Sequence, residues 1–316
     1  MGTACVAIVI IIFGVAVVRA KVDPSSSSSI PGRAYPSRAS HSPNIPDTTF
    51  YFGLYTPESP FSYQGVTSFT AATGVRPDLV VYYSGWFEPF WASFAAAAVN
   101  HGALPLVQLN PRGATVAAIA SGQYDDYLIT YARAVRAYGH RVVMSFGHEM
   151  NGQWYPWGYR HTSPTVFVAA WRHIVTIFRQ VGARNVTWMW TVNTVEPQHE
   201  TIPDPAAWWP GSSYVNWVGI DGYFHQRSAQ FVSVFGPTIV DVRELTKDPI
   251  LISETGAAPN VGQSAKIASL FAGVHAYGLL GFVWFDAVGN ADYRIESAAA
   301  IAAVREGVKT YLPQDQ

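Results

Sequence analysis

Short apolar runs alternate with amphipathic stretches from about Thr48 to the end of the chain, and this pattern carries most of the information in the sequence. Eight runs are rich in β-branched and aromatic residues, which is typical of buried strands. They are Phe50–Tyr55, Leu79–Tyr83, Leu104–Leu109, Val142–Phe146, Val186–Thr191, Trp217–Ile220, Ile250–Ser253 and Gly281–Phe285.

Helical spacing of apolar residues is found between these runs. The clearest stretches are Phe90–His101, Tyr124–Tyr138, Pro164–Val181, Phe231–Thr246, Ser264–Tyr277 and Ser297–Tyr311. Ser163 before Pro164 is typical of a capped helix start, and Gly139 and Gly182 are typical of helix ends. The pattern predicts an α/β protein with one (β/α)8 TIM barrel. An open doubly wound sheet is the alternative, but no glycine-rich phosphate loop follows the first strand.

The first 47 residues differ in composition from the rest. Residues 4–18 are apolar or small. In the segment Val18-Arg19-Ala20 that follows, Val18 and Ala20 are the small or apolar residues that a signal peptidase recognises before its cleavage site. We predict that residues 1–20 are a signal peptide or, alternatively, an anchor that tethers the protein to a membrane through residues 4–18. Either would make the protein secreted or extracytoplasmic. Residues 21–47 are predicted to be a disordered Ser/Pro-rich linker, and residues 48–316 the catalytic domain.

Bulk composition excludes several classes of function. The net charge is −1, so nothing indicates binding to nucleic acid or to an anionic membrane surface. The single cysteine, Cys5, lies in the predicted leader, so disulfide and zinc–thiolate chemistry is not expected in the mature chain. Aromatic residues make up 14% of the chain, enough for a core and for surfaces that stack on sugars. We expect no cofactor, no metal and a monomer.

Polar and aromatic side chains gather at the ends of the predicted strands, where a (β/α)8 barrel carries its active site. They occur in the segments Tyr83-Ser84-Gly85-Trp86, His148-Glu149, Trp190-Thr191-Val192-Asn193, Asp221-Gly222-Tyr223, Ser253-Glu254-Thr255-Gly256 and Trp284-Phe285-Asp286. Two glutamates end the fourth and seventh strands, so we expect their carboxyl groups to share one mouth of the barrel.

Two carboxyl groups are what the hydrolysis of a glycosidic bond requires. When they lie about 5–5.5 Å apart, one acts as acid/base and the other as nucleophile, and the anomeric configuration is retained. We assign the acid/base to Glu149, because Trp154, Tyr155 and Trp157 follow it and burial against apolar rings raises the pKa of a carboxyl group. Glu254 is then the nucleophile.

Other candidates surround this pair. Tyr223 could donate the hydrogen bond that orients Glu254, and His148 could position Glu149 or contact the sugar. Structural alternatives are a salt bridge for each glutamate, a core aromatic for Tyr223 and a structural role for His148. Further candidates for substrate contact are Trp86, Trp154, Trp157 and Asn193.

Several of these segments resemble glycoside hydrolase family 26. The likeness is most specific in its acid/base region, Gly147-His148-Glu149-Met150-Asn151-Gly152-x-Trp154-Tyr155-Pro156-Trp157-Gly158. Three more segments are similar: Asp221-Gly222-Tyr223, Ser253-Glu254-Thr255-Gly256, and the Trp284 strand followed by Asp292-Tyr293-Arg294-Ile295. That family comprises retaining (β/α)8 enzymes, mostly endo-β-1,4-mannanases, with some β-1,3-1,4-glucanases and β-1,3-xylanases.

The resemblance implies an acid/base at Glu149 and a nucleophile at Glu254. It also implies that the subsites nearest the scissile bond are lined by His148, Trp154, Asp221, Tyr223 and Trp284. The chain departs from the family at Gln108-Leu109-Asn110-Pro111, at Pro156 and at Phe285. These departures concern the identity of the substrate and not the mechanism. We expect a polysaccharide or oligosaccharide substrate, with mannan as the first expectation and mixed-linkage β-glucan as the second.

Other functional classes fit the sequence less well. A non-catalytic polysaccharide-binding barrel would not need both glutamates. A zinc enzyme is disfavoured because Gly152 stands where the zinc helix motif that begins at His148 needs its second histidine. A serine hydrolase is disfavoured because no Gly-x-Ser-x-Gly elbow is found.

Overall fold

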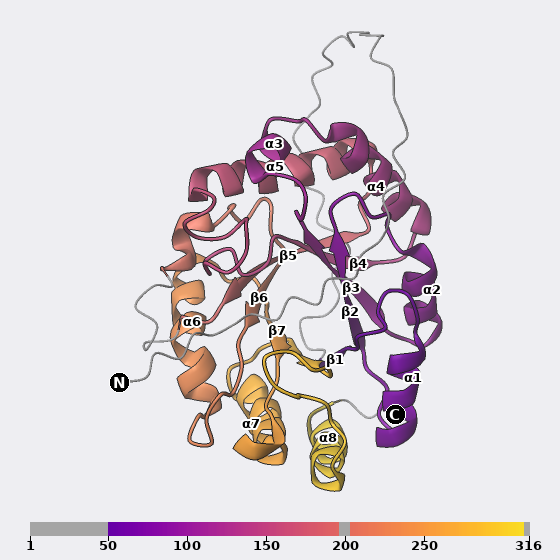
Figure 1. The fold of residues 1–316 in the computed structure, drawn as a ribbon, viewed down its shortest axis with the longest axis vertical. Coiled ribbons are helices and arrows are strands. Elements are labelled where there is room, and N and C mark those ends of the chain that lie inside the picture. Colours follow the sequence, from indigo (N-terminus) through magenta and orange to yellow (C-terminus); the bar gives the residue numbers. More distant parts are fainter. Residues whose placement is uncertain (1–49, 196–202, 313–316) are drawn as a thin grey trace.

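The computed structural model describes residues 50–195 and 203–312. Eight parallel strands close into a barrel in the order of the sequence, with β8 paired to β1 (Figure 1). The strands are β1 (Tyr51–Tyr55), β2 (Leu79–Gly85), β3 (Leu104–Asn110), β4 (Val142–Phe146), β5 (Val186–Asn193), β6 (Trp217–Asp221), β7 (Ile250–Thr255) and β8 (Gly281–Phe285). The prediction of a (β/α)8 barrel is confirmed.

Helices surround the strands on the outside of the barrel (Figure 1). They are α1 (Gln64–Thr73), α2 (Ala92–Asn100), α3 (Val116–Ala120), α4 (Asp125–Tyr138), α5 (Pro164–Val181), α6 (Phe231–Leu245), α7 (Gln263–Ala276) and α8 (Ala298–Tyr311), with short 3-10 turns at Pro205–Trp208 and Pro259–Val261. All six predicted helices are found. The helix α1 was not predicted, because Gly65 and several threonines weaken its helical pattern.

Local signals fix the ends of α5 as the sequence predicts. The Ser163 side chain accepts a hydrogen bond from the backbone N–H of Val166, and Pro164 occupies the first turn, where its missing N–H costs nothing. Gly182 ends the helix in the left-handed conformation, with φ of 81°.

One end of the barrel is sealed by side chains. Alternate strand residues fill the interior with aliphatic side chains, including those of Val81, Leu106 and Met189. At the N-terminal ends of the strands, the rings of Tyr51 and Trp217 lie 5.6 Å apart. The guanidinium group of Arg141 lies over the Trp217 ring at 5.0 Å. Because this end is closed, an active site belongs at the opposite mouth, where the strands end.

A β-bulge in β7 changes which side chains face the interior. On β6, Gly219 pairs with Leu251 and Asp221 pairs with Glu254, so β7 has one more residue than β6 between these pairs. The same shift occurs against β8. The extra residue breaks the strict alternation of the strand, so Ser253 and Glu254 both approach Asp221 and the barrel mouth. The bulge therefore positions the predicted nucleophile.

The predictions for the leader and the linker concern residues that lie outside the described part of the chain. Among residues 50–195 and 203–312, no helix is long and apolar enough to cross a membrane. The signal peptide, the tether through residues 4–18 and the linker at residues 21–47 stay predictions.

The close packing at Gly219 gives the first testable prediction. A Cβ atom at this position would lie 2.4 Å from the Ser253 Oγ and 2.7 Å from the Thr191 Oγ1. We expect Gly219→Ala to lower the free energy of unfolding by about 1–3 kcal/mol, as overpacking of a core does. Denaturant unfolding followed by circular dichroism measures this change.

The matched control is Gly289→Ala in the exposed loop after β8, where the nearest atom, the Phe285 Cε1, would lie at an ordinary contact distance of 3.5 Å. The added methyl group meets no overlap there, so this variant should be about as stable as the wild type. Equal stability of the two variants would contradict the packing of the barrel interior.

Candidate active site

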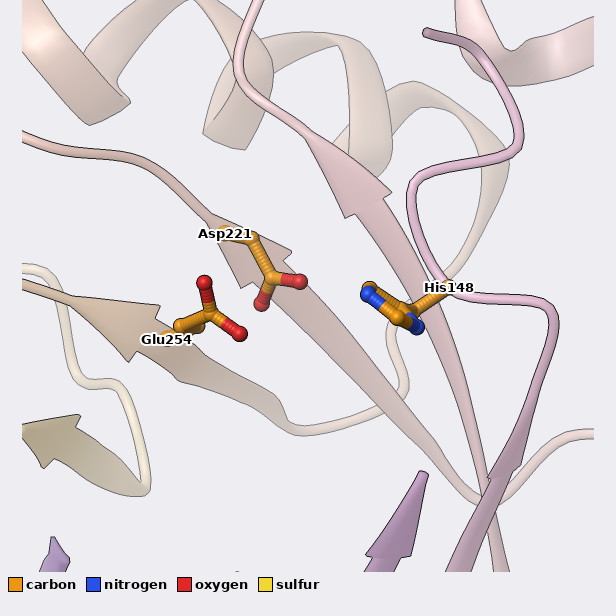
Figure 2. Close-up of side chains that lie close together, drawn as sticks. All are labelled: His148, Asp221 and Glu254. Carbon is orange, nitrogen blue, oxygen red and sulfur yellow. The ribbon is translucent and has the colours of Figure 1, made fainter. Parts of the chain in front are cut away.

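The two predicted catalytic glutamates lie at the same mouth of the barrel. Glu149 lies in the loop after β4, next to His148, and Glu254 lies in the bulged end of β7. Figure 2 shows His148, Asp221 and Glu254 directed toward one another from the loop after β4, from β6 and from β7. The structure thus brings together residues that are about 100 positions apart in the sequence, as expected of barrel strand ends.

The backbone at Glu149 is strained. Its φ is 55°, a left-handed conformation that is rare for residues other than glycine. The Glu149 N–H donates to the Thr191 carbonyl at 3.0 Å, and the Glu149 carbonyl accepts from the Gly152 N–H at 2.9 Å. These hydrogen bonds hold the residue in a conformation that it would otherwise avoid, which is a common feature of functional sites.

The Glu149 carboxyl group is buried and accepts two hydrogen bonds. Trp154 donates its indole N–H to Oε2 at 2.6 Å, and Asn193 donates its amide N–H to Oε1 at 2.6 Å. The pKa of Glu149 is raised to about 8, chiefly by burial and then by the negative charge of Glu254, while the two donors oppose the rise. A carboxyl group in this environment keeps its proton at neutral pH.

Asn193 is itself held in place by a second asparagine. The Asn151 side chain accepts from the Asn193 backbone N–H and donates to the Asn193 carbonyl, both at 2.9 Å. Asn151 is fully buried. Asn151 belongs to the His-Glu-Met-Asn-Gly motif in the sequence. That it fixes the end of β5 through two hydrogen bonds to the Asn193 backbone was not predicted.

The Glu254 carboxyl group is bound by two phenol hydroxyls. Tyr223 donates to Oε1 at 2.6 Å, and Tyr83 donates to Oε2. Burial raises the pKa of Glu254, while the two hydroxyl donors favour its ionised form and oppose the rise. The contact of Tyr223 agrees with its predicted orienting role. Tyr83 was missed, although it stands at the end of the second predicted strand.

Asp221 is a third carboxyl group in the site. It is fully buried and accepts a hydrogen bond from the Ser253 hydroxyl at 2.5 Å. Burial, followed by the charges of Glu254 and Glu149, raises its pKa well above the usual range. The hydrogen bond from Ser253 ties Asp221 to the bulged end of β7, beside Glu254.

His148 lies beside Asp221 and Glu254, and its side chain is 2% exposed. Its Nδ1 lies 2.9 Å from the Asn110 Oδ1, and its Nε2 lies 3.3 Å from the Tyr155 hydroxyl. The pKa of His148 is lowered to about 3, chiefly by burial and then by the positive charge of Arg112. The histidine is therefore neutral.

A metal ion is a possible occupant to consider, because ligand atoms of His148, Asp221 and Glu254 lie within 4.8 Å of one another. Both nitrogens of His148 already have partners, and Glu254 accepts from two tyrosines. These contacts favour hydrogen bonding to a sugar over coordination of a metal.

Three of the predicted substrate-binding tryptophans are buried. Trp86 is 4% exposed and packs against Tyr127 and Phe146, while Trp157 and Trp284 are fully buried. A ring with no exposed face cannot stack on a sugar, so substrate contact by these three side chains is not supported. Of the other predicted contacts, Trp154, Asn193 and Tyr223 donate hydrogen bonds to the two glutamates, and His148 and Asp221 are buried beside Glu254.

Phe285 occupies the position that was expected for Trp284. Trp284 pairs with Thr255 and directs its indole N–H to the Tyr293 carbonyl at 2.9 Å, away from the interior. The next residue, Phe285, stacks on Tyr55 at 4.7 Å and meets the Tyr223 ring edge to face at 6.2 Å. Because strand residues alternate, one position of shift exchanges the inner and outer aromatic residues.

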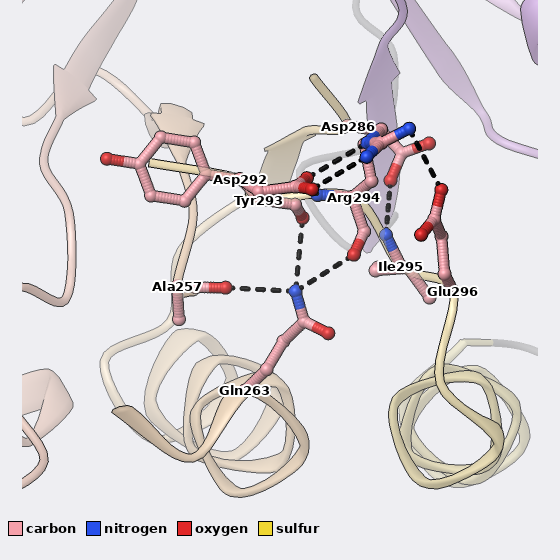
Figure 3. A network of polar contacts seen from close by, with 8 residues as sticks. All are labelled: Ala257, Gln263, Asp286, Asp292, Tyr293, Arg294, Ile295 and Glu296. Carbon is pink, nitrogen blue, oxygen red and sulfur yellow. Dashed lines mark hydrogen bonds and ion pairs between the residues drawn. The ribbon is translucent and has the colours of Figure 1, made fainter. Parts of the chain in front are cut away.

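A polar network behind Tyr223 fixes the loop that follows β8 (Figure 3). The buried Gln263 amide donates to the carbonyls of Ala257, Tyr293 and Arg294 at 2.9, 3.1 and 3.1 Å. This loop places the Tyr293 ring 4.8 Å from the Tyr223 ring. The network therefore supports the tyrosine that binds the predicted nucleophile, although it does not touch the site itself.

Comparison with known proteins agrees with this geometry. The family model described as "Glycosyl hydrolase family 26" matches residues 126–260. The chain is 31% identical over 264 residues to Endoglucanase H of Acetivibrio thermocellus, which covers 78% of this chain and 29% of that protein. The chain belongs to glycoside hydrolase family 26. It spans 13–35% of the length of the curated relatives it matches.

Solved structures show that the family's fold extends over most of the described chain. A family 26 β-mannanase from Bacteroides ovatus superposes with a TM-score of 0.62 at 16% identity, covering 83% of this chain and 89% of that one. A double mutant of an endo-β-1,4-mannanase from Cellulomonas fimi also gives 0.62, at 17% identity and coverages of 84% and 71%. This family 26 chain therefore shares the barrel of these enzymes.

The raised pKa of Glu149 predicts how stability depends on pH. A carboxyl group whose pKa is raised by folding, here from 4.5 to about 8, contributes its full stability below pH 4.5. That contribution is lost as the pH rises toward 8, at about 1.4 kcal/mol for each unit of pKa shift. We expect Glu149→Gln to be more stable than the wild type at pH 8 and similar to it at pH 4.

Thermal unfolding at pH 4, 6 and 8 tests this expectation. Glu306→Gln, which removes an exposed carboxyl group from α8, is the matched control and should follow the wild type at each pH. If Glu149→Gln also follows the wild type from pH 4 to pH 8, Glu149 is not held in its protonated form by folding.

Proposed function

We propose that the chain is a retaining endo-β-glycanase in which Glu149 is the acid/base and Glu254 is the nucleophile. The observation that supports this most strongly is the contrast between the two carboxyl groups. Glu149 accepts hydrogen bonds from an indole and an amide, whereas Glu254 accepts two phenol O–H bonds. Two buried carboxyl groups in one site cannot both ionise easily, so one keeps a proton and the other carries the charge.

In the first step, Glu149 donates its proton to the glycosidic oxygen as the bond to the leaving sugar breaks. Glu254 attacks the anomeric carbon from the opposite face and forms a covalent ester. Tyr223 and Tyr83 hold the Glu254 oxygens in place before the attack. As the ester forms, Glu254 loses its negative charge and these two hydrogen bonds weaken. The leaving sugar departs with the proton of Glu149.

In the second step, the same glutamate has to act as a base. Formation of the ester removes the negative charge of Glu254, which was one cause of the raised pKa of Glu149. The pKa of Glu149 then falls, and its carboxylate can take a proton from the water that attacks the ester. Hydrolysis restores Glu254 and the original charge distribution.

For the substrate, we propose a β-glucan ahead of mannan. The relative matched over 78% of the chain is named an endoglucanase, whereas a mannan endo-1,4-beta-mannosidase of Bifidobacterium adolescentis is matched over 40%. Mannan, the first expectation from the sequence, is kept as the second candidate because the structural neighbours include several mannanases. The half-exposed rings of Trp154, Tyr155 and Phe285 offer surfaces on which either sugar could stack.

Export from the cytoplasm through residues 1–20 belongs to the same proposal. It is supported by the apolar leader and by an expected polymeric substrate, which cannot enter a cell. The monomeric state stays a prediction.

The nucleophile can be tested by chemical rescue. We expect Glu254→Ala to lose activity by about 10⁴-fold or more, because no covalent intermediate can form. Added azide should restore turnover of an activated aryl glycoside and give a glycosyl azide of inverted configuration. Glu149→Ala should retain the first step on substrates with good leaving groups, which need little protonation. Wild-type activity of the Glu254 variant would contradict the assignment.

The two tyrosines that donate to Glu254 can be tested separately. We expect Tyr223→Phe and Tyr83→Phe each to lower kcat by about 10- to 100-fold, since each removes one donor from a charged partner. The matched control is Tyr138→Phe, which removes a hydroxyl that donates to the Ala95 carbonyl in the helical layer. Its kcat should equal that of the wild type. Unchanged kcat in both site variants would exclude their orienting role.

A product profile tests the substrate proposal. We expect the enzyme to release oligosaccharides of several lengths from mixed-linkage β-glucan, with a higher kcat/KM than on mannan or xylan. Reducing-sugar assays and chromatography of the products measure both quantities. A higher kcat/KM on mannan would reverse the proposed order, and release of one short product from the chain end would contradict endo action.

A further inference from the structure

The His148 ring is held between two polar side chains, one from the end of β3 and one from the loop after β4. Asn110 is the last residue of β3, and its Oδ1 lies 2.9 Å from the His148 Nδ1. On the other side of the ring, the Tyr155 hydroxyl lies 3.3 Å from Nε2. Both His148 and Asn110 are buried, with exposed fractions of 2% and 5%. Water therefore does not compete for these contacts as it would at the surface.

The chemistry of these groups fixes where the protons lie. An amide oxygen only accepts hydrogen bonds, so the His148 Nδ1 must carry a proton. A neutral imidazole has one proton, which leaves Nε2 with a lone pair that accepts. The Tyr155 hydroxyl is then the donor to Nε2, and its oxygen lone pairs remain free.

We propose that Asn110 is a positioning residue that holds His148 in the Nδ1–H tautomer and thereby makes Tyr155 a hydrogen-bond acceptor toward the sugar. Asn110 does not touch the sugar in this proposal and acts through His148. The part of the proposal that concerns the sugar rests on the proposed function, whereas the tautomer does not.

The position of the Tyr155 ring supports this role. The ring stacks on Trp157 with centroids 4.4 Å apart and planes inclined by 11°. The Trp157 indole N–H donates to the His148 carbonyl at 2.8 Å, and the Arg112 guanidinium group lies 5.9 Å from the Tyr155 ring. The hydroxyl oxygen is therefore fixed in place, and the direction of its proton is the variable that Asn110 controls.

A neutral His148 also matters for the adjacent Glu149. A positive charge on the histidine would favour the carboxylate form of Glu149 and weaken it as an acid. An asparagine at position 110 supplies an acceptor for Nδ1 and carries no charge. A negative charge at this position would stabilise the imidazolium form of His148. The choice of asparagine over aspartate thus keeps a cation away from the acid/base.

Nitrogen NMR of histidine tests the tautomer directly. The full chain is labelled with ¹⁵N in its histidines, and the His148 signals are assigned by their loss in His148→Gln. Long-range proton–nitrogen correlations separate the two neutral tautomers and the imidazolium form. At pH 7 we expect a proton on Nδ1 and none on Nε2. A proton on Nε2, alone or together with one on Nδ1, would overturn the proposal.

Variants of Asn110 test the cause. Asn110→Leu has a similar size and no acceptor, so we expect the proton to move to Nε2 in at least part of the molecules. Asn110→Asp should convert His148 to the imidazolium form at a higher pH than in the wild type. The matched control is Asn216→Asp at the opposite end of the barrel, where the side chain accepts from the Trp188 N–H; it should leave the His148 signals unchanged. Unchanged signals in both Asn110 variants would show that Asn110 does not set the tautomer.

A double-mutant cycle on the preferred glycan then tests the route through Tyr155. We expect Asn110→Leu and Tyr155→Phe each to lower kcat/KM by about tenfold, and the double variant to lose no more than either single one. Additive losses would show that Asn110 does not act through Tyr155. The NMR result stands apart from the proposed function, because it would hold even for a protein that cleaves none of the glycans.

Discussion

The repulsion between two buried carboxyl groups is the interaction on which the site depends. Glu149 and Glu254 approach each other at the mouth of a barrel whose other end is sealed, so neither charge is well solvated. Two phenol hydroxyls favour the charge on Glu254, and this charge helps to keep the proton on Glu149. Glu149 thus owes part of its raised pKa to Glu254, and in the proposed mechanism this part is lost when the charge of Glu254 is consumed.

Local distortions of the backbone make this arrangement possible. The bulge in β7 turns Glu254 toward the interior, and the left-handed conformation of Glu149 turns its side chain toward Trp154 and Asn193. Such features lower the stability of a fold, and the surrounding hydrogen bonds must hold them. The site is therefore built where the regular barrel geometry is interrupted.

The sequence predicted the barrel well, because its strands and most helices have strong periodic patterns and clear caps. It also predicted that Glu149 and Glu254 share one mouth of the barrel, since charged residues are scarce at apolar strand ends. It could not predict which of two neighbouring aromatics faces the interior, as Trp284 and Phe285 show, because a shift of one residue exchanges the faces. Tyr83 and Asn110 were missed because their partners, Glu254 and His148, lie far away in the sequence.

Trapping of the covalent intermediate tests the central claim most directly. A 2-deoxy-2-fluoro glycoside with a good leaving group slows both steps but allows the ester to accumulate on a retaining enzyme. Mass spectrometry of the peptides from the inactivated protein then locates the sugar. The account predicts one sugar per chain, attached to the peptide that contains Glu254. A sugar on another residue, or turnover with inversion and no labelled peptide, would contradict it.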